Sequence, residues 1–133
     1  MRISVSLFLL AVASTAAFAE APADFLNAYA QEAKQQNPGY KGPSPQQGQR
    51  FFTSLHGHEW SCSSCHTSNP ATAGRHEVTN KVIEPLAPSA NAARFTRQAK
   101  VDKWFKRNCN DVLGRACSAE EKADVMAYLL SVK

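Results

Sequence analysis

Five consecutive residues, Cys62-Ser63-Ser64-Cys65-His66, constrain this chain more than any other feature. Two thiols three positions apart can each bond to one vinyl group on the same edge of a porphyrin. The histidine that follows directly can then offer an imidazole nitrogen to the iron beneath the ring. Cys-x-x-Cys-His is the attachment pattern of c-type haem. The sequence therefore predicts one covalently bound haem c, held by Cys62 and Cys65, with His66 as the proximal iron ligand.

Two other kinds of site use similar cysteines. A thioredoxin-like redox pair has the Cys-x-x-Cys spacing but lies among alternating strands and helices, a pattern that this sequence lacks. A zinc site would combine Cys62 and Cys65 with two of Cys109, Cys117 and His66. The seven-residue gap between Cys109 and Cys117 fits no common zinc spacing. Haem attachment is thus the favoured interpretation.

The N-terminus has the composition of an export signal. Arg2 supplies a positive charge, an apolar stretch runs from Ile3 to Val12, and small residues end at Ala17-Phe18-Ala19. This pattern predicts a signal peptide that is cleaved after Ala19. The apolar stretch is shorter than the about 20 residues that span a membrane, and no later segment is long enough. We therefore expect a periplasmic protein that is not integral to the membrane, and in bacteria c-type haem is attached outside the cytoplasm.

Apolar spacing predicts helices at both ends of the mature chain. From Pro22 to Asn37 one face is apolar and holds Phe25, Leu26, Tyr29 and Ala33. Ser118 and Glu121 form a capping box at the start of the last helix. The apolar face of that helix holds Ala119, Ala123, Met126, Ala127 and Leu130, with Leu129 beside it, and Glu120, Glu121 and Asp124 lie opposite.

Two further helices are expected between these. Ser44 and Pro45 have the chemistry of an N-cap and a first helical position. The helix that they begin has an apolar stripe that faces a core, formed by Gly48, Phe51, Phe52 and Leu55. A short helix is expected over Gln98–Arg107, with Val101, Trp104 and Phe105 on its apolar side. Residues 67–91 lack periodicity and predict a long irregular segment of the kind that wraps a functional site.

The chain is expected to be all-α, because no alternating run is long enough for a sheet. The composition, 44% hydrophobic and 20% charged, is that of a globular protein and excludes wholesale disorder. We expect a signal peptide at 1–19, an N-terminal helix and loop at 20–44, and a cytochrome c domain at 45–133.

The residue on the other side of the iron decides whether the haem has a permanent sixth ligand or binds external ones. Met126 is the only methionine after the signal peptide, and its place on an apolar helix face favours core packing. His56 and His58 precede the haem motif, and His76 lies in the loop after it. None of the three histidines has a recognisable ligand context.

Cys109 and Cys117 remain after haem attachment. In an oxidising compartment two cysteines this close are predicted to form a disulfide. Closing a loop of nine residues contributes about 2.6 kcal/mol. The disulfide could simply link two helices, or it could hold the turn that contains Asn108 at a fixed height above the haem.

The chain resembles the SHP ("sphaeroides haem protein") family of oxygen-binding monohaem cytochromes c. The similarity runs from about Pro45 to Leu130 and leaves Pro22–Asn37 unmatched. The segments that carry it are Cys62-Ser-Ser-Cys-His66, Asn80-Lys-Val-Ile-Glu-Pro85, Ala93-Arg-Phe-Thr96, Lys103-Trp-Phe-Lys-Arg-Asn-Cys109, Leu113-Gly-Arg-Ala-Cys117 and Glu121-Lys-Ala-Asp124.

This resemblance implies a class I cytochrome c-like helical fold around one haem, here with an extra N-terminal helix. In that family the sixth ligand is an asparagine just before the first cysteine of a disulfide, which here is Asn108. Asn110 is a neighbouring candidate, and only this match separates the two. A neutral amide binds reduced iron weakly, so reduction is expected to release it and to let O2, NO or CO bind. The resemblance also implies a multihaem cytochrome c as electron donor.

The expected role is therefore one-electron transfer with binding of a diatomic ligand, rather than enzymatic catalysis. One alternative is a plain electron carrier with Met126 or a histidine as permanent sixth ligand. Another is a small haem reductase of O2, peroxide or nitrogen oxides. Such an enzyme would need acid-base help, which His56 or His58 could supply only by folding over the distal face.

Positive charge is concentrated in residues 94–107. This stretch contains one acidic residue, Asp102, and six cationic residues. The cationic residues are Arg94, Arg97, Lys100, Lys103, Lys106 and Arg107. A solvated helix face and a docking patch for an acidic redox partner are both consistent with this pattern. Lys106 or Arg107 could instead pair with the haem propionates. Nucleic-acid binding is not expected, because the sequence has no recognition motif.

Overall fold

The computed structural model describes residues 20–57 and 59–133, so the expected signal peptide and His58 lie outside the described residues. The described part contains five helices, which are α1 (Pro22–Gln36), α2 (Pro45–Thr53), α3 (Cys62–His66), α4 (Gln98–Leu113) and α5 (Ala119–Ser131). Two short strands, β1 (Gly74–Arg75) and β2 (Val82–Ile83), pair antiparallel with Gly74 opposite Ile83. The helical fold class is confirmed. The hairpin was not predicted, because two-residue strands are too short to show alternation.

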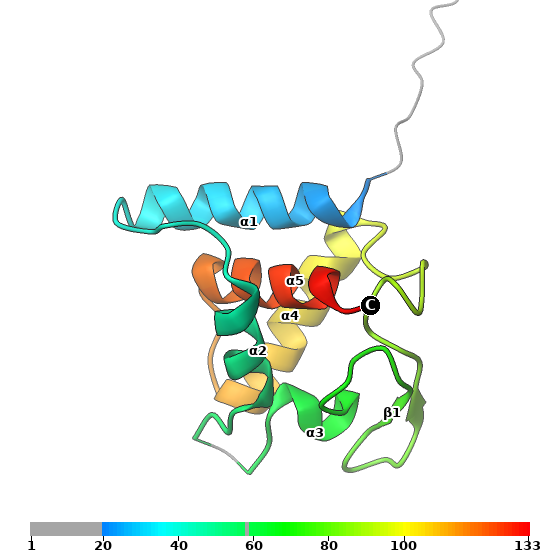
Figure 1. Ribbon diagram of the computed structural model, residues 1–133. Coiled ribbons are helices and arrows are strands. Elements are labelled where there is room, and N and C mark those ends of the chain that lie inside the picture. The colour runs from blue at the N-terminus through cyan, green and yellow to red at the C-terminus, as the bar shows by residue number, and fades with distance from the viewer. Residues whose placement is uncertain (1–19, 58) are drawn as a thin grey trace, which may run out of the picture.

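Helix α5 is the centre of the fold, and α1 and α2 both run against it (Figure 1). One face of α5 packs with α1 and α4 in a cluster that contains Phe25, Tyr29, Val101, Ala123 and Met126. Another face packs with α2 in a second cluster, which contains Phe52, Val125, Tyr128 and Leu129. Because both faces are covered, every residue from 123 to 129 is buried.

Three sequence predictions about these helices were wrong. Asp124 was expected on a polar face, but α2 covers that face and leaves the side chain only 6% exposed. Leu55 was expected to face the core, but α2 ends at Thr53 and Leu55 is 67% exposed. The helix expected over Gln98–Arg107 continues to Leu113, where Gly114 ends it with a φ of 70°, a conformation that glycine adopts readily.

The crossing of α2 and α5 depends on close backbone contact. The amide of Ser44, the N-cap residue of α2, donates a 2.7 Å hydrogen bond to the Asp124 carboxylate. One turn later, Gly48 lies so close to α5 that a Cβ there would come within 1.9 Å of the Asp124 carbonyl oxygen. Glycine at this position therefore sets how closely the two helices approach.

Replacing Asp124 by asparagine is expected to stabilise the protein at neutral pH. Burial is the main reason that the pKa of Asp124 is raised, and the charge of Glu120 adds to it. An acid with a raised folded-state pKa contributes less to stability as the pH rises above its ordinary pKa of about 4. Asp124→Asn removes this charge and keeps an oxygen that accepts the Ser44 amide.

Urea unfolding as a function of pH measures this effect. The stability difference between Asp124→Asn and the parent should be largest at neutral pH and should shrink toward pH of about 4. A variant that is less stable than the parent at neutral pH would contradict the argument.

Among residues 20–57 and 59–133, no helix combines the length and the apolar character needed to cross a lipid bilayer.

Candidate functional site: the Cys-x-x-Cys-His helix and the inner face of α4

The Cys-x-x-Cys-His sequence forms the one-turn helix α3 because the serines around it cap it. The Ser61 hydroxyl accepts the Ser64 amide at 3.2 Å, and the Ser64 hydroxyl accepts the Ser61 amide at 3.0 Å. Cys62 and Cys65 are half-buried and are not bonded to each other. Burial raises the pKa of Cys62 to about 11, so this thiol stays protonated. A redox-active Cys-x-x-Cys pair needs a lowered pKa instead.

His66, at the end of α3, is suited to bind a metal through its ring. Its Nδ1 is buried and has no hydrogen-bond partner among the described residues. Burial, followed by the charge of Arg94, lowers the pKa of His66 to about 4, so the imidazole is neutral. The ring lies 6.3 Å from the ring of Phe52, centroid to centroid. Two free thiols and a neutral imidazole on one turn of helix fit the donor set of a c-type haem.

The β1 strand lies directly against this motif. A Cβ on Gly74 would come within 2.0 Å of the Cys65 carbonyl oxygen, so only glycine allows this approach. The irregular segment after α3 is held in place at Pro70, whose carbonyl accepts the amides of Leu86 and Ala87 at 2.8 and 2.9 Å. Residues 67–91 thus fold back onto the neighbourhood of His66, as expected for a segment that wraps a site.

The helical positions of Asn108 and Asn110 place them on different faces of α4. The inner face of this helix carries the buried residues Val101 and Cys109 and the half-buried residue Phe105. Asn108 is half-buried and lies on the same face, seven residues after Val101. Asn110 is exposed and lies on the opposite side of the helix. Only Asn108 therefore lies on the face of α4 that is directed at the core.

A shared apolar cluster connects this face of α4 with the haem motif. Cys62 and Phe105 both pack against the cluster formed by Phe52 and its neighbours on α5. Phe105 precedes Asn108 by one turn of α4. The structure thus brings the Cys-x-x-Cys-His helix and the turn that carries Asn108 to the border of the same cluster.

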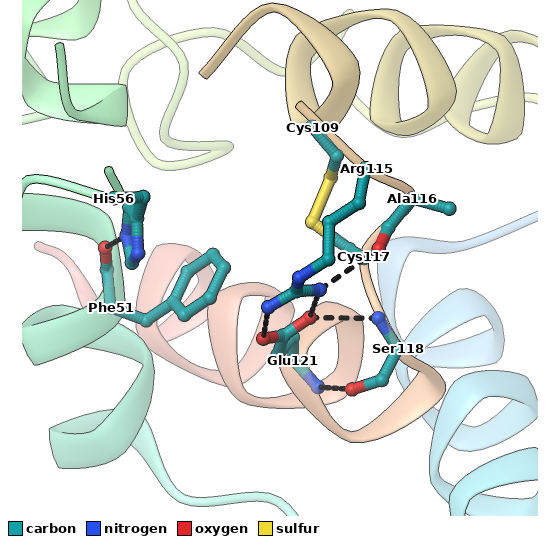
Figure 2. Close-up of a disulfide and its surroundings, with 8 residues drawn as sticks. All are labelled: Phe51, His56, Cys109, Arg115, Ala116, Cys117, Ser118 and Glu121. Atoms are coloured by element: carbon teal, nitrogen blue, oxygen red, sulfur yellow. Dashed lines mark hydrogen bonds and ion pairs between the residues drawn. A yellow bond between two sulfur atoms is a disulfide. The ribbon is translucent and has the colours of Figure 1, made fainter. Parts of the chain in front are cut away.

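Cys109 and Cys117 form the expected disulfide, with Cα atoms 5.6 Å apart. Figure 2 shows how the turn between them is fastened to α5. The Arg115 guanidinium donates to both carboxylate oxygens of Glu121, at 2.6 and 2.8 Å. The same carboxylate accepts the Ser118 amide at 2.8 Å. The carboxyl end of α4 is therefore held both covalently and through an ion pair.

The other candidate iron ligands have structural contacts. Met126 is 0% exposed and packs in the cluster between α1, α4 and α5. The Nε2 of His56 lies 2.6 Å from the Phe51 carbonyl oxygen, and its ring packs on that of Phe51. The Nδ1 of His76 accepts the amides of Val78 and Thr79 in the turn after β1. These contacts favour a structural role over iron ligation for Met126, His56 and His76.

Sequence reasoning missed the role of Arg94, which it grouped with the surface cations. Arg94 is half-buried and donates to the carbonyls of Pro85 and Glu84 at 2.9 and 2.6 Å. Its positive charge contributes to the lowered pKa of His66.

The cations further along α4 lie at the surface. The guanidinium of Arg107 lies 5.5 Å from the ring centroid of Trp104, a residue that is 43% exposed, and 3.7 Å from the Asp111 carboxylate. The three residues Arg97, Lys100 and Lys103 line a shallow hollow with Trp104.

Comparisons with known proteins agree with this site. A family model described as a domain of unknown function (DUF1924) matches residues 38–129. Cytochrome c'' of Methylophilus methylotrophus is 44% identical over an alignment of 133 positions. The alignment covers 92% of this chain and 92% of that protein. The c-type cytochrome SHP of Cereibacter sphaeroides is 52% identical over 69 residues, 52% of this chain and 53% of that protein.

Solved structures of the same two proteins share the fold. The structure of oxidised SHP, an oxygen binding cytochrome c, has a TM-score of 0.72 at 38% identity and covers 82% of this chain and 95% of its own. The solution structure of cytochrome c'', which concerns haem-ligand detachment, has a TM-score of 0.74 at 43% identity and covers 83% and 92%. Both proteins are c-type cytochromes, whose haem is covalently bound. This chain therefore belongs to the family of c-type cytochromes that includes cytochrome c'' and SHP.

Proposed function

We propose that this protein is a periplasmic monohaem cytochrome c in which Asn108 is the distal iron ligand and leaves the iron on reduction, so that O2, NO or CO can bind. The observation that carries the proposal is the position of Asn108. It lies half-buried on the inner face of α4, next to the disulfide, whereas Asn110 points away. The expected signal peptide, cleaved after Ala19, would direct export of the chain to the periplasm.

Each residue of the site would have one task. Cys62 and Cys65 hold the haem by thioether bonds, and the neutral imidazole of His66 binds its iron. The haem, when bound, supplies an iron that exchanges one electron and has a sixth coordination position. Asn108 presents a neutral amide, which is a weak donor and weaker still toward reduced iron. Once released, this amide can donate a hydrogen bond to an external ligand.

The relatives support a labile sixth position. SHP is an oxygen binding cytochrome c, and cytochrome c'' is a protein in which haem-ligand detachment has been analysed structurally. The packing of Met126 in the α1 cluster argues against the plain carrier with a permanent methionine ligand. The contacts of His56 and His76 argue in the same way against a permanent histidine from those positions.

Visible spectra of the oxidised and reduced protein, with and without CO, test the proposal. The ferric haem is expected to be six-coordinate, and the ferrous haem five-coordinate and high-spin until CO is added. Asn108→Met should keep the ferrous haem six-coordinate and should lower its CO affinity by at least about tenfold, the factor for 1.4 kcal/mol of competing ligand bond.

Asn110→Met is the matched control, because it places the same side chain two residues away on the exposed side of α4. Its spectra should equal those of the parent. A low-spin, six-coordinate ferrous parent without added ligand would refute the release of the asparagine. An Asn108→Met variant with an unaltered ferric spectrum would refute Asn108 as the ligand.

The outer face of α4 is the proposed docking surface for an acidic redox partner, for which a multihaem cytochrome c is the candidate. Lys100 and Lys103 surround the exposed ring of Trp104. Asp102, the acid within this cationic stretch, accepts a hydrogen bond from Tyr29 of α1. A mainly cationic surface with an exposed aromatic ring is suited to steer and hold an acidic protein.

A further inference from the structure

Helix α4 packs on the core through Val101 and Phe105, and each of its ends has a further attachment. While α1 and α2 each run close against α5, α4 makes few close backbone approaches to any other helix. Its carboxyl end is fixed by the disulfide of Cys109. Its amino end is capped by Glu20, two residues before α1, whose carboxylate accepts the Gln98 amide at 2.7 Å. The capping group thus comes from outside α4, whose own N-cap residue, Arg97, makes no side-chain cap.

A second attachment joins the first two turns of α4 to α1. The hydroxyl of Tyr29, a residue that is only 3% exposed, donates a hydrogen bond to Asp102 Oδ1. Gln98 Nε2 donates to the same carboxylate oxygen at 2.9 Å and to the Tyr29 hydroxyl at 3.3 Å. We call these three residues, Tyr29, Gln98 and Asp102, the α1–α4 clamp. Burial and then the hydrogen bond to Asp102 raise the pKa of Tyr29, so its hydroxyl stays a donor at physiological pH.

The clamp is in contact with the turn that carries the distal ligand. The ring of Tyr29 meets the ring of Phe105 edge-on, with centroids 5.6 Å apart and planes at 84°. Phe105 packs against both core clusters and lies three residues before Asn108. A change at Tyr29 therefore reaches the turn of Asn108 through a single aromatic contact.

The family model that matches this chain begins at residue 38, after the end of α1. The clamp thus connects a segment outside that model to the helix of the distal ligand. We propose that α1, through the α1–α4 clamp, is a positioning element that holds Asn108 at the iron in the oxidised state. This inference rests on the proposed function, because it assumes that Asn108 is the sixth ligand.

Competition with azide at the ferric haem tests the clamp, because azide has to displace Asn108. Tyr29→Phe removes the hydroxyl and keeps the ring contact with Phe105. It is expected to raise the azide affinity about fivefold, the factor given by the net free energy of one typical hydrogen bond. Asp102→Ala should have a similar effect, measured by titration of the visible spectrum.

Asp111→Ala is the control for charge. It also removes a carboxylate from α4, but this carboxylate is exposed and its pair with Arg107 contributes little. Its azide affinity should equal that of the parent. If Asp111→Ala raises the affinity as much as Asp102→Ala, the effect is one of charge and the clamp proposal is wrong.

A double-mutant cycle with Asn108→Ala separates the clamp from the proposed function. Asn108→Ala alone should raise the azide affinity, and adding Tyr29→Phe should then change nothing. If Tyr29→Phe lowers only the unfolding temperature and leaves the azide affinity of the parent unchanged, the clamp is merely structural. An effect that persists in the Asn108→Ala background places the action of Tyr29 elsewhere. If Asn108→Ala itself leaves the affinity unchanged, the proposed function is wrong and this inference with it.

Discussion

Gly48→Ala is expected to prevent the protein from folding normally. A Cβ at this position would lie 1.9 Å from the carbonyl oxygen of Asp124, 2.4 Å from its carbonyl carbon and 2.9 Å from the amide of Val125. All three atoms belong to the backbone of α5, so no side-chain rotation relieves the clash. The helices must separate instead, and the expected loss is about 4 kcal/mol or more, the upper end for a single substitution.

The yield of haem-containing protein and its midpoint of urea unfolding measure this loss. Gly39→Ala is the matched control, because the nearest atom to its added Cβ, 3.2 Å away, is a side-chain oxygen, Oδ1 of Asn37, and not a backbone atom of another helix. That variant should unfold close to the parent. A Gly48→Ala protein with a normal yield and midpoint would mean that α2 and α5 do not need their close contact.

The crossing of α2 and α5 also positions Phe52, which lies one turn after Gly48 on α2. Phe52 follows Gly48 by four residues and inserts into the cluster on α5, where its ring packs near that of Tyr128 at 5.5 Å. The same ring is the neighbour of His66. The glycine contact therefore determines where the aromatic neighbour of His66 lies.

Local chemistry made the beginnings of the helices predictable. Ser44 accepts the amide of Gln47, and Ser118 exchanges hydrogen bonds with Glu121, as their sequence patterns indicate. Each of these contacts joins residues three positions apart. The sequence of the segment alone is therefore sufficient to set them.

Burial was less predictable, because it depends on partners that are distant in the sequence. Asp124 has a polar side chain and lies in the last helix, and nothing in that segment reveals that α2 will cover it. The contact that buries it joins residues eighty positions apart. Arg94 was assigned to the surface for the same reason, since its partners, Glu84 and Pro85, lie in an irregular segment without periodicity.

The choice between Asn108 and Asn110 shows how an error in a boundary limits an argument about a site. The sequence predicted that the helix ends at Arg107, so neither asparagine had a helical face assigned to it. In the structure α4 continues to Leu113. Once both residues are helical, a separation of two positions places them on opposite sides. The partial burial of Asn108 and the exposure of Asn110 identify Asn108 as the inner one.

Phe52→Ala is expected to destabilise the protein by about 3–5 kcal/mol, the usual cost of deleting a buried phenylalanine ring. The ring is fully buried, and it joins α2, α5 and the haem motif in one cluster. Its loss leaves a cavity beside both Tyr128 and His66. We therefore expect a second effect, a broadened haem spectrum, because the imidazole of His66 loses the neighbour that limits its orientation.

Denaturant unfolding and the visible spectrum of the same samples separate the two effects. Leu55→Ala is the control, since it also removes a large apolar side chain near the end of α2 but from an exposed position. It should change the stability by no more than about 0.5 kcal/mol. Equal losses of stability from Phe52→Ala and Leu55→Ala would mean that both side chains face the core. The apolar stripe predicted from the sequence would then be right, and the ending of α2 at Thr53 would be wrong.

Phe52→Leu distinguishes packing from the aromatic contact with His66. Leucine refills most of the space, so this variant should recover most of the stability that Phe52→Ala loses. If the haem spectrum recovers as well, apolar volume alone orients the imidazole. If the stability recovers and the spectrum stays broadened, the edge or face of the ring is needed to hold His66. We expect the second result, because a branched aliphatic side chain lacks the aromatic ring whose centroid lies 6.3 Å from that of the imidazole, tilted by 44°.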